Sequence, residues 1–321
     1  MMTYNEFIKI LKETVLEQLP KEFEGASVKV EEIKKLNCSY ESLQIFKPGS
    51  YIAPCLNLTE LYGHYQKTED LADVYGVIRV MIGQQPEGLA DCRLDSYEFI
   101  KEKLFLRVSN AKTNKELLET APHMILGDIA VTYHVAIEKN EEEVGSILIT
   151  HEILDQYGVS EEQLKKDTLA NAPKVFPPVL ENINRVMVQM LTGDGQPGTV
   201  PFEEAVEEFG QSKTDMFVLT NERRSNGAAM IVYPGVLDKI AESAESDLFI
   251  IPSSIHETLI LQDNELMQAC DLEAMIREIN ANEVLPEDRL SDSLYHYDRK
   301  ARVLERAADF ATRKTLQECS A

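Results

Sequence analysis

The stretch from Thr214 to Gln262 constrains the fold most, because short apolar runs alternate in it with polar or Gly/Pro breaks. Apolar runs of this length are typical of strands, and the pair Asn226-Gly227 accepts positive φ at low cost. Pro234-Gly235 ends the second run, and apolar residues recur at helical spacing after it. The stretch therefore predicts a strand over 216–220, a turn, a strand over 229–233, a helix and two further strands.

Helices and short hairpins alternate in the rest of the chain as well. We expect an antiparallel meander over 27–58, a long helix over 60–82 and a hairpin of strands 129–137 and 146–150. An amphipathic pattern over 179–191 predicts a helix, and a final helix is expected from Arg299 to about Leu316. Because many connections between strands are short, the pattern favours an α+β fold over a doubly wound parallel sheet.

A Gly- and Pro-rich stretch over 192–199 separates two parts of similar character. Such punctuation between periodic segments is typical of a linker. The sequence therefore predicts two lobes, an N-terminal α+β lobe of residues 1–191 and a C-terminal α+β lobe of residues 200–321.

The chain is strongly acidic, and this limits its partners. It has 321 residues with 32 Lys and Arg against 55 Asp and Glu, a formal charge of −23. Such a surface repels phosphate backbones and anionic membranes, so we expect no nucleic-acid or membrane partner. The N-terminus does not read as a signal peptide, and no apolar run is long enough to span a bilayer. Five scattered cysteines without a CxxC pair favour free thiols in the cytoplasm.

Three segments carry a family resemblance: FVLTN…NGAAMIVYPGVLDKIA, FIIPSSIHETLIL and LSDSLYHYDR. They resemble a family of uncharacterised bacterial proteins known as domain of unknown function 5688. The resemblance extends to the segment 114–118 ahead of the strand that begins near Asp128, and so covers nearly the whole chain. It implies a cytosolic protein, and it assigns no catalytic residue.

The sharpest polar cluster is Ser254 with His256. Residues two apart on a strand share a face, so His256 could act as the base of a Ser254 nucleophile. Glu257 would point to the opposite face, and the chain has no GxSxG elbow to present the serine. The alternative, which the sequence favours, is a strand break in which serine hydroxyls satisfy backbone groups and His256 bonds locally.

Metal and phosphate motifs are weak. His151-Glu152 and His256-Glu257 each lack a second histidine four residues on, so neither is a zincin helix. The glycines of 193–198 do not open a helix after a strand, as a phosphate-binding loop would require. We therefore expect no metal and no cofactor.

Two polar surfaces are candidates for binding. One is the turn that contains Asn221, Asn226 and Gly227. The other is the final helix, where Arg299, Arg302 and Arg306 lie beside an apolar face and suit a protein partner or self-association; the alternative is a solvated edge that covers the core.

Two functions are consistent with this sequence. The first is a non-catalytic cytosolic binding or regulatory protein that meets its partner at the turn or the final helix. The second is a hydrolase that uses Ser254 and His256.

Overall fold

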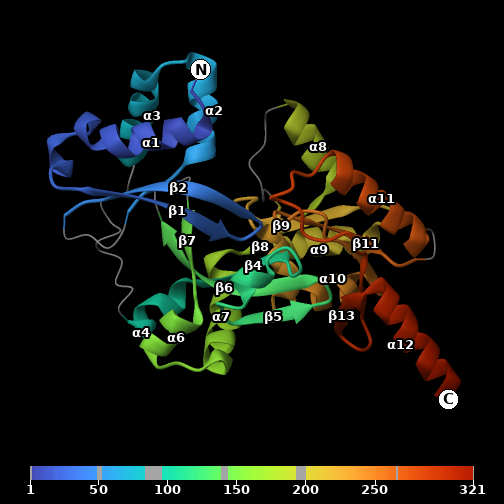
Figure 1. Cartoon of the computed structure of the whole chain (residues 1–321). Helices are drawn as coiled ribbons and strands as arrows, with labels where there is room; N and C mark the ends of the chain where they lie inside the picture. Colours follow the sequence, from blue (N-terminus) through green and yellow to red (C-terminus); the bar gives the residue numbers. More distant parts are fainter. Residues whose placement is uncertain are drawn as a thin grey trace. The chain divides into compact units, whose positions relative to one another are not determined.

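The computed structural model describes residues 2–48, 53–83, 96–138, 144–192, 200–264 and 267–320 (Figure 1). Two compact units are present: the described residues up to Gly83 form the first, and those from Ser96 onward form the second. Helices accompany three sheets in which the paired strands run antiparallel. The expected α+β fold is confirmed.

The first unit packs three helices with a three-stranded sheet of order β1-β2-β3, as the expected meander requires. A capping box formed by Thr3 and Glu6 begins its first helix. Phe7 and Leu11 of that helix share a buried cluster with Leu43 of the central strand. The elements are α1 (Tyr4–Thr14), η1 (Val15–Gln18), η2 (Lys21–Phe23), β1 (Ser27–Lys35), β2 (Cys38–Phe46), β3 (Cys55–Asn57), α2 (Leu58–Thr68) and α3 (Leu71–Gly83).

The single helix predicted over 60–82 is wrong, because the chain breaks it into α2 and α3. Glu69 adopts a left-handed conformation with φ 53° and ends α2. The Asp70 carboxylate then accepts a hydrogen bond from the Ala72 backbone N–H at 2.8 Å, where α3 begins. Glu69 and Asp70 thus end one helix and cap the next, although the helical pattern of apolar residues continues across them.

The second unit contains two sheets. The four-stranded sheet has the order β4-β6-β5, with β7 paired to β6, and the six-stranded sheet has the order β13-β12-β10-β11-β9-β8. The strands are β4 (Leu104–Asn110), β5 (His123–Leu126), β6 (Ile129–Glu138), β7 (Val144–Leu148), β8 (Pro178–Asn182), β9 (Phe217–Asn221), β10 (Leu248–Ile251), β11 (Thr258–Gln262), β12 (Tyr295–Asp298) and β13 (Val303–Arg306). The β6–β7 hairpin confirms the one expected over 129–150.

Helices and 3-10 turns connect these strands. They are α4 (Tyr97–Ile100), η4 (Lys101–Lys103), α5 (Lys115–Leu118), α6 (His151–Tyr157), α7 (Glu161–Val175), α8 (Ile183–Thr192), α9 (Phe202–Gln211), η5 (Gly227–Val232), α10 (Val236–Ala244), α11 (Ala269–Asn282) and α12 (Ala307–Ser320). Within the described ranges no helix is both long and apolar enough to cross a bilayer.

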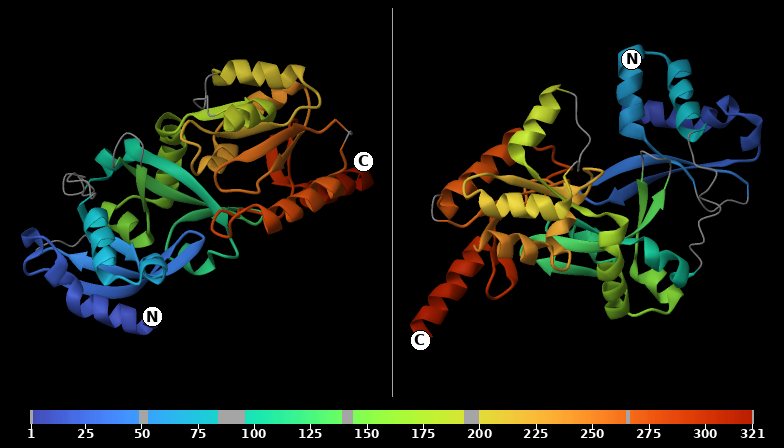
Figure 2. Two further views of the ribbon diagram at one scale, coloured as in Figure 1. Left: turned by 90° about the horizontal axis from the view of Figure 1, so that it is seen from above. Right: turned by 180° about the vertical axis from the view of Figure 1, so that it is seen from behind.

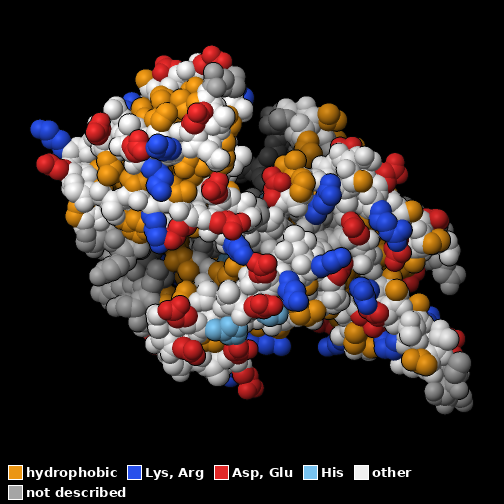
Figure 3. Space-filling model, in the orientation of Figure 1, with side chains coloured by type: hydrophobic (Ala, Val, Ile, Leu, Met, Phe, Trp, Pro, Cys, Tyr) orange, Lys and Arg blue, Asp and Glu red, His pale blue; other side chains and the backbone are white. Residues whose placement is uncertain are grey.

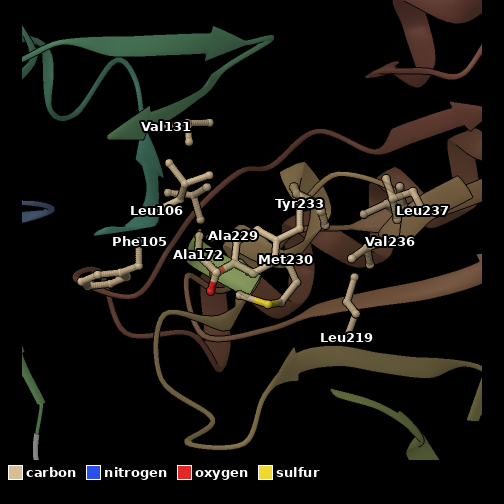
Figure 4. Close-up of a cluster of buried hydrophobic side chains, with 14 of the residues drawn as sticks. Phe105, Leu106, Val131, Ala172, Leu219, Ala229, Met230, Tyr233, Val236 and Leu237 are labelled. Atoms are coloured by element: carbon tan, nitrogen blue, oxygen red, sulfur yellow. The ribbon is translucent and has the colours of Figure 1, made fainter. Parts of the chain in front are cut away.

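The main core of the second unit lies around η5. Leu106 and Val131 from the four-stranded sheet, Ala229 and Met230 from η5, and Leu219 from the six-stranded sheet belong to one buried cluster (Figure 4). Because both sheets contribute to this cluster, it joins them into one cooperative unit.

The two units divide the chain differently from the lobes predicted at 1–191 and 200–321. Strand β8 precedes the expected linker and pairs with β9, which follows it. Strands from both sides of 192–199 therefore share one sheet. Residues 193–199 themselves lie outside the described residues. β8 also replaces the first turn of the helix expected over 179–191.

The strand predicted over 229–233 is wrong, because this segment is the 3-10 turn η5. β9 pairs on its two sides with β8 and β11, so neither of its edges is left for a hairpin partner. Ala228, Ala229 and Met230 are almost fully buried in the turn. When every residue of an apolar run is buried, the spacing of apolar residues along the sequence does not distinguish a strand from a helix.

The helix predicted from Arg299 to Leu316 is also wrong over its first half. The chain completes β12, turns at Arg302 with φ 55°, and returns as β13. Only then does α12 begin, at Ala307, and both views of Figure 2 show it running outward from the sheet that contains β13. The candidate residues Arg299, Arg302 and Arg306 therefore lie on a hairpin and not on a helix.

Candidate functional site

The loop between β9 and η5, residues 221–227, is built around one buried amide side chain. Asn221 Oδ1 accepts hydrogen bonds from the Arg223 N–H at 3.0 Å and the Ser225 N–H at 3.4 Å, and its Nδ2 donates to the Ser225 carbonyl at 2.9 Å. Asn221 is 2% exposed. Its side chain therefore organises the loop from inside, as Asn side chains commonly do in turns.

Gly227 allows this loop to approach the segment around His256. A Cβ at this position would lie 2.2 Å from Thr220 Oγ1 and 2.6 Å from the His256 carbonyl oxygen. The Thr220 hydroxyl donates a hydrogen bond to that same carbonyl at 2.8 Å. Only a residue without a side chain fits between these groups.

Both nitrogens of the His256 ring hold partners. The Asn226 backbone N–H donates to Nδ1 at 3.3 Å, so Nδ1 is the unprotonated nitrogen. Nε2 then carries the proton and donates to Asp288 Oδ1 at 3.1 Å. The histidine thus bridges the loop and the segment that follows α11, and its tautomer is set by these two contacts.

The Ser254 hydroxyl is hydrogen-bonded to the backbone of His256 and not to its imidazole ring. Its Oγ accepts a hydrogen bond from the His256 backbone N–H at 3.0 Å. Its backbone forms an isolated bridge with Arg289, and the Ile255 N–H donates to the Asp288 carbonyl at 2.8 Å. Ser254 and His256 are therefore brought together, but through backbone capping and not through a hydroxyl–imidazole contact.

An ion pair ties the loop to β8. Arg224 Nη2 lies 2.5 Å from Glu181 Oε2 and 3.2 Å from Gln189 Oε1. The Glu181 side chain is only 1% exposed, so the pair is largely withdrawn from water. With Arg224 held inward, Glu222 and Arg223 are exposed on the loop.

The three arginines predicted to bind a partner are engaged elsewhere in the second unit. The backbone N–H of Arg299 donates to Asp247 Oδ1 at 2.9 Å, and the guanidinium group of Arg302 contacts Glu242 Oε1 at 3.0 Å. Arg306 Nε donates to Asp309 Oδ2 at 2.7 Å. In Figure 3, Lys and Arg side chains on this unit lie among Asp and Glu side chains. The guanidinium groups of Arg302 and Arg306 are thus paired with carboxylates, and the three arginines do not join the site at the loop.

The sequence did not single out two acidic residues that the structure places at the centre of polar networks. Asp288 binds His256 from 32 residues away, with no signal in the spacing. Asp128 accepts hydrogen bonds from Ser291 Oγ at 2.8 and 2.9 Å, Ser293 Oγ at 3.2 Å and Tyr295 OH at 2.7 Å. The i, i+2 spacing of the three hydroxyls on one face of LSDSLY is the signal that could have revealed this second network.

Ser291 and Tyr295 of the Asp128 network are buried, and this burial changes the chemistry of the tyrosine. Burial raises the pKa of Tyr295 well above its usual value, and the hydrogen bond to Asp128 and its charge raise it further. Tyr295 therefore stays protonated and donates, which joins the two sheets. Among the residues that the structure describes, no three His, Cys, Asp or Glu side chains are placed to hold a metal ion.

The chain matches no curated protein and no solved structure. A family model described as a family of unknown function (DUF5688) matches residues 4–299, which is nearly the whole chain and includes the loop 221–227, His256, Asp288 and the Asp128 network. The match agrees with the resemblance of the three sequence segments. This protein therefore belongs to the DUF5688 family.

Proposed function

We propose that this protein is a non-catalytic binding protein that meets a protein partner through the loop 221–227, which we call the recognition loop. The observation that carries the proposal is the engagement of both His256 nitrogens, by Asn226 and Asp288. The His256 imidazole is the side chain best suited to acid–base chemistry, and both of its nitrogens instead hold the loop in place. A loop fixed in advance loses little conformational entropy when it binds, which favours recognition.

The exposed part of the recognition loop is small: it comprises Ser225 and two residues of opposite charge. Glu222 and Arg223 are exposed, whereas Asn221 and Gly227 are buried. We therefore assign Asn221, Asn226 and Gly227 the role of shaping the loop, and the two charged residues the role of contacting the partner. A rim of opposite charges gives orientation and specificity more than affinity.

We further propose that the protein acts in the cytoplasm and binds neither nucleic acid nor membranes. Cys55 and Cys270 are exposed free thiols, which persist in a reducing compartment. The formal charge of −23 opposes contact with phosphate-rich surfaces.

Charge reversal at the exposed positions tests the recognition loop. The full chain is immobilised, and proteins retained from a native lysate are compared for wild type and the Glu222→Lys/Arg223→Glu variant. We expect a specific partner to be lost while the thermal midpoint is unchanged. Lys112→Glu/Glu119→Lys is a matched control, because both residues are exposed in the same unit. Equal retention by both variants contradicts the proposal.

A hydrolase remains the second candidate because Asp288 supplies the carboxylate that a catalytic histidine needs, at 3.1 Å. Reaction with a fluorophosphonate probe separates the two functions. We expect no labelling, since His256 Nδ1 faces the Asn226 N–H and not the Ser254 hydroxyl. Labelling that disappears in Ser254→Ala would favour the hydrolase; a known serine hydrolase serves as the positive control.

A further inference from the structure

A cavity of about 240 Å³ lies in the second unit where α9 leads into β9 and β11 ends. It is separate from the recognition loop, which lies at the other end of β9. Its volume is below the roughly 300–1,000 Å³ of sites for drug-sized ligands, so it suits a small metabolite.

Part of the cavity lining is apolar and consists of Phe249, Leu261 and Met267. Phe249 and Leu261 are both buried and face each other across β10 and β11 in register. They belong to a cluster with Leu272 and Ile276 of α11, which fixes their positions. Met267 adds a flexible thioether that is 42% exposed and can adapt to a ligand.

Two residues of opposite charge, Lys213 and Asp215, also line the cavity. Asp215 Oδ2 accepts a hydrogen bond from Asn182 Nδ2 at 3.1 Å, which orients the carboxylate. Over the described part of the chain, neither Lys213 nor Asp215 forms an ion pair, with the other or with a third residue. An ammonium and a carboxylate that remain uncompensated beside an apolar surface match a ligand that carries both charges.

We propose that this cavity binds a free α-amino acid with an apolar side chain. The side chain lies on Phe249, Leu261 and Met267, the ligand carboxylate pairs with Lys213, and the ligand ammonium pairs with Asp215. A neutral apolar ligand would leave both charges unused, and a dianion would be repelled by Asp215. The inference does not depend on the function proposed for the recognition loop.

Isothermal titration of the full chain with L-leucine, L-methionine and L-phenylalanine tests the site. We expect saturable binding of at least one of them. Glycine, 4-methylpentanoate and 3-methylbutylamine lack the side chain, the ammonium and the carboxylate in turn, and each should bind at least about tenfold more weakly.

Variants identify the cavity as the site of binding. Lys213→Gln and Asp215→Asn each remove one charge and should lower the affinity about tenfold. Met267→Ala should lower it several-fold without loss of folding, because this residue is partly exposed. Lys112→Gln removes an exposed lysine elsewhere in the unit and should leave the affinity unchanged.

Three results overturn the proposal. One is the absence of saturable binding for all three amino acids at concentrations up to about 10 mM, tenfold above a Kd of about 1 mM that marks weak binding. Another is equal affinity of the Lys213→Gln and Lys112→Gln variants. The third is binding of glycine, 4-methylpentanoate or 3-methylbutylamine as tightly as the amino acid.

Discussion

Gly227 shows how much of the recognition loop depends on one missing side chain. Besides Thr220 Oγ1 and the His256 carbonyl, the Asn221 N–H nitrogen lies 2.8 Å from the position that a Cβ would take. These neighbours are backbone atoms or a hydroxyl that is already hydrogen-bonded, so they cannot move aside independently. The sequence indicated a turn at Asn226-Gly227, but the close approach that demands the glycine is a tertiary feature.

We expect Gly227→Ala to lower the free energy of unfolding of the second unit by about 2–4 kcal/mol, because the added methyl group overpacks a rigid contact. Urea denaturation measures the change. Gly63→Ala is the control: it lies in α2 with nothing within 4 Å of its added Cβ, and should be neutral or stabilising by up to ~1 kcal/mol. Equal effects of the two substitutions would contradict the close approach.

His134 makes the stability of the second unit depend on pH. Burial holds the pKa of its imidazole well below 6.5, and the charge of Arg107 acts in the same direction. The folded chain therefore keeps His134 neutral, whereas the unfolded chain binds a proton once the pH falls below about 6.5. Stability is lost as the pH falls through this value, since the unfolded state binds more protons there.

Replacement of His134 by glutamine removes this dependence. Between pH 7.5 and pH 5.5 wild type should lose about 1.4 kcal/mol more unfolding free energy than His134→Gln. Denaturant titrations at both pH values measure the difference in unfolding free energy. The contribution of carboxylate titration is the same in wild type and in His134→Gln, so it cancels in the comparison. A parallel pH dependence of both proteins would show that His134 is protonated in the folded state.

Elements with a clear period or a local cap could be predicted from the sequence. The β6–β7 hairpin is confirmed because its signals are local. η5 could not be predicted, since its apolar run is buried on every side. The β12–β13 hairpin was missed because a helical spacing of arginines outweighed the strand-forming pair at Tyr295 and Tyr297. In the candidate site, Asp288 and Glu181 could not be found, because only the fold brings them to the loop.

The Glu181–Arg224 pair links three elements and can be tested as a unit. Arg224→Met should lower the unfolding free energy by about 2 kcal/mol, because a buried carboxylate loses its principal cation. The value lies below the usual cost for a fully buried pair, since Arg224 is itself 24% exposed. Glu181→Gln/Arg224→Met should recover most of the loss, as measured by thermal denaturation. An equal or larger loss in the double variant would argue against an electrostatic cause.

The whole molecule contains two units with separate buried clusters. The cluster of the first unit includes Leu43, and the main cluster of the second includes Ile240; both side chains are fully buried. Units with their own cores unfold as their own cooperative transitions unless a large interface couples them.

Calorimetry of the full chain should therefore resolve two transitions. Leu43→Ala should lower the midpoint of one and Ile240→Ala that of the other, each through a loss of about 2–5 kcal/mol from the cavity created. A shift of both transitions by either substitution, or a single transition with equal calorimetric and van't Hoff enthalpies, would show that the chain unfolds as one unit.

The contacts of Asp128 also carry a consequence for biosynthesis. Its partners Ser291, Ser293 and Tyr295 lie more than 160 residues later in the chain. A polypeptide emerging from the ribosome exposes the Asp128 carboxylate long before those hydroxyls have been made. The second unit therefore cannot reach its native packing during most of translation, and a nascent chain released early would present an unfinished sheet to chaperones and proteases.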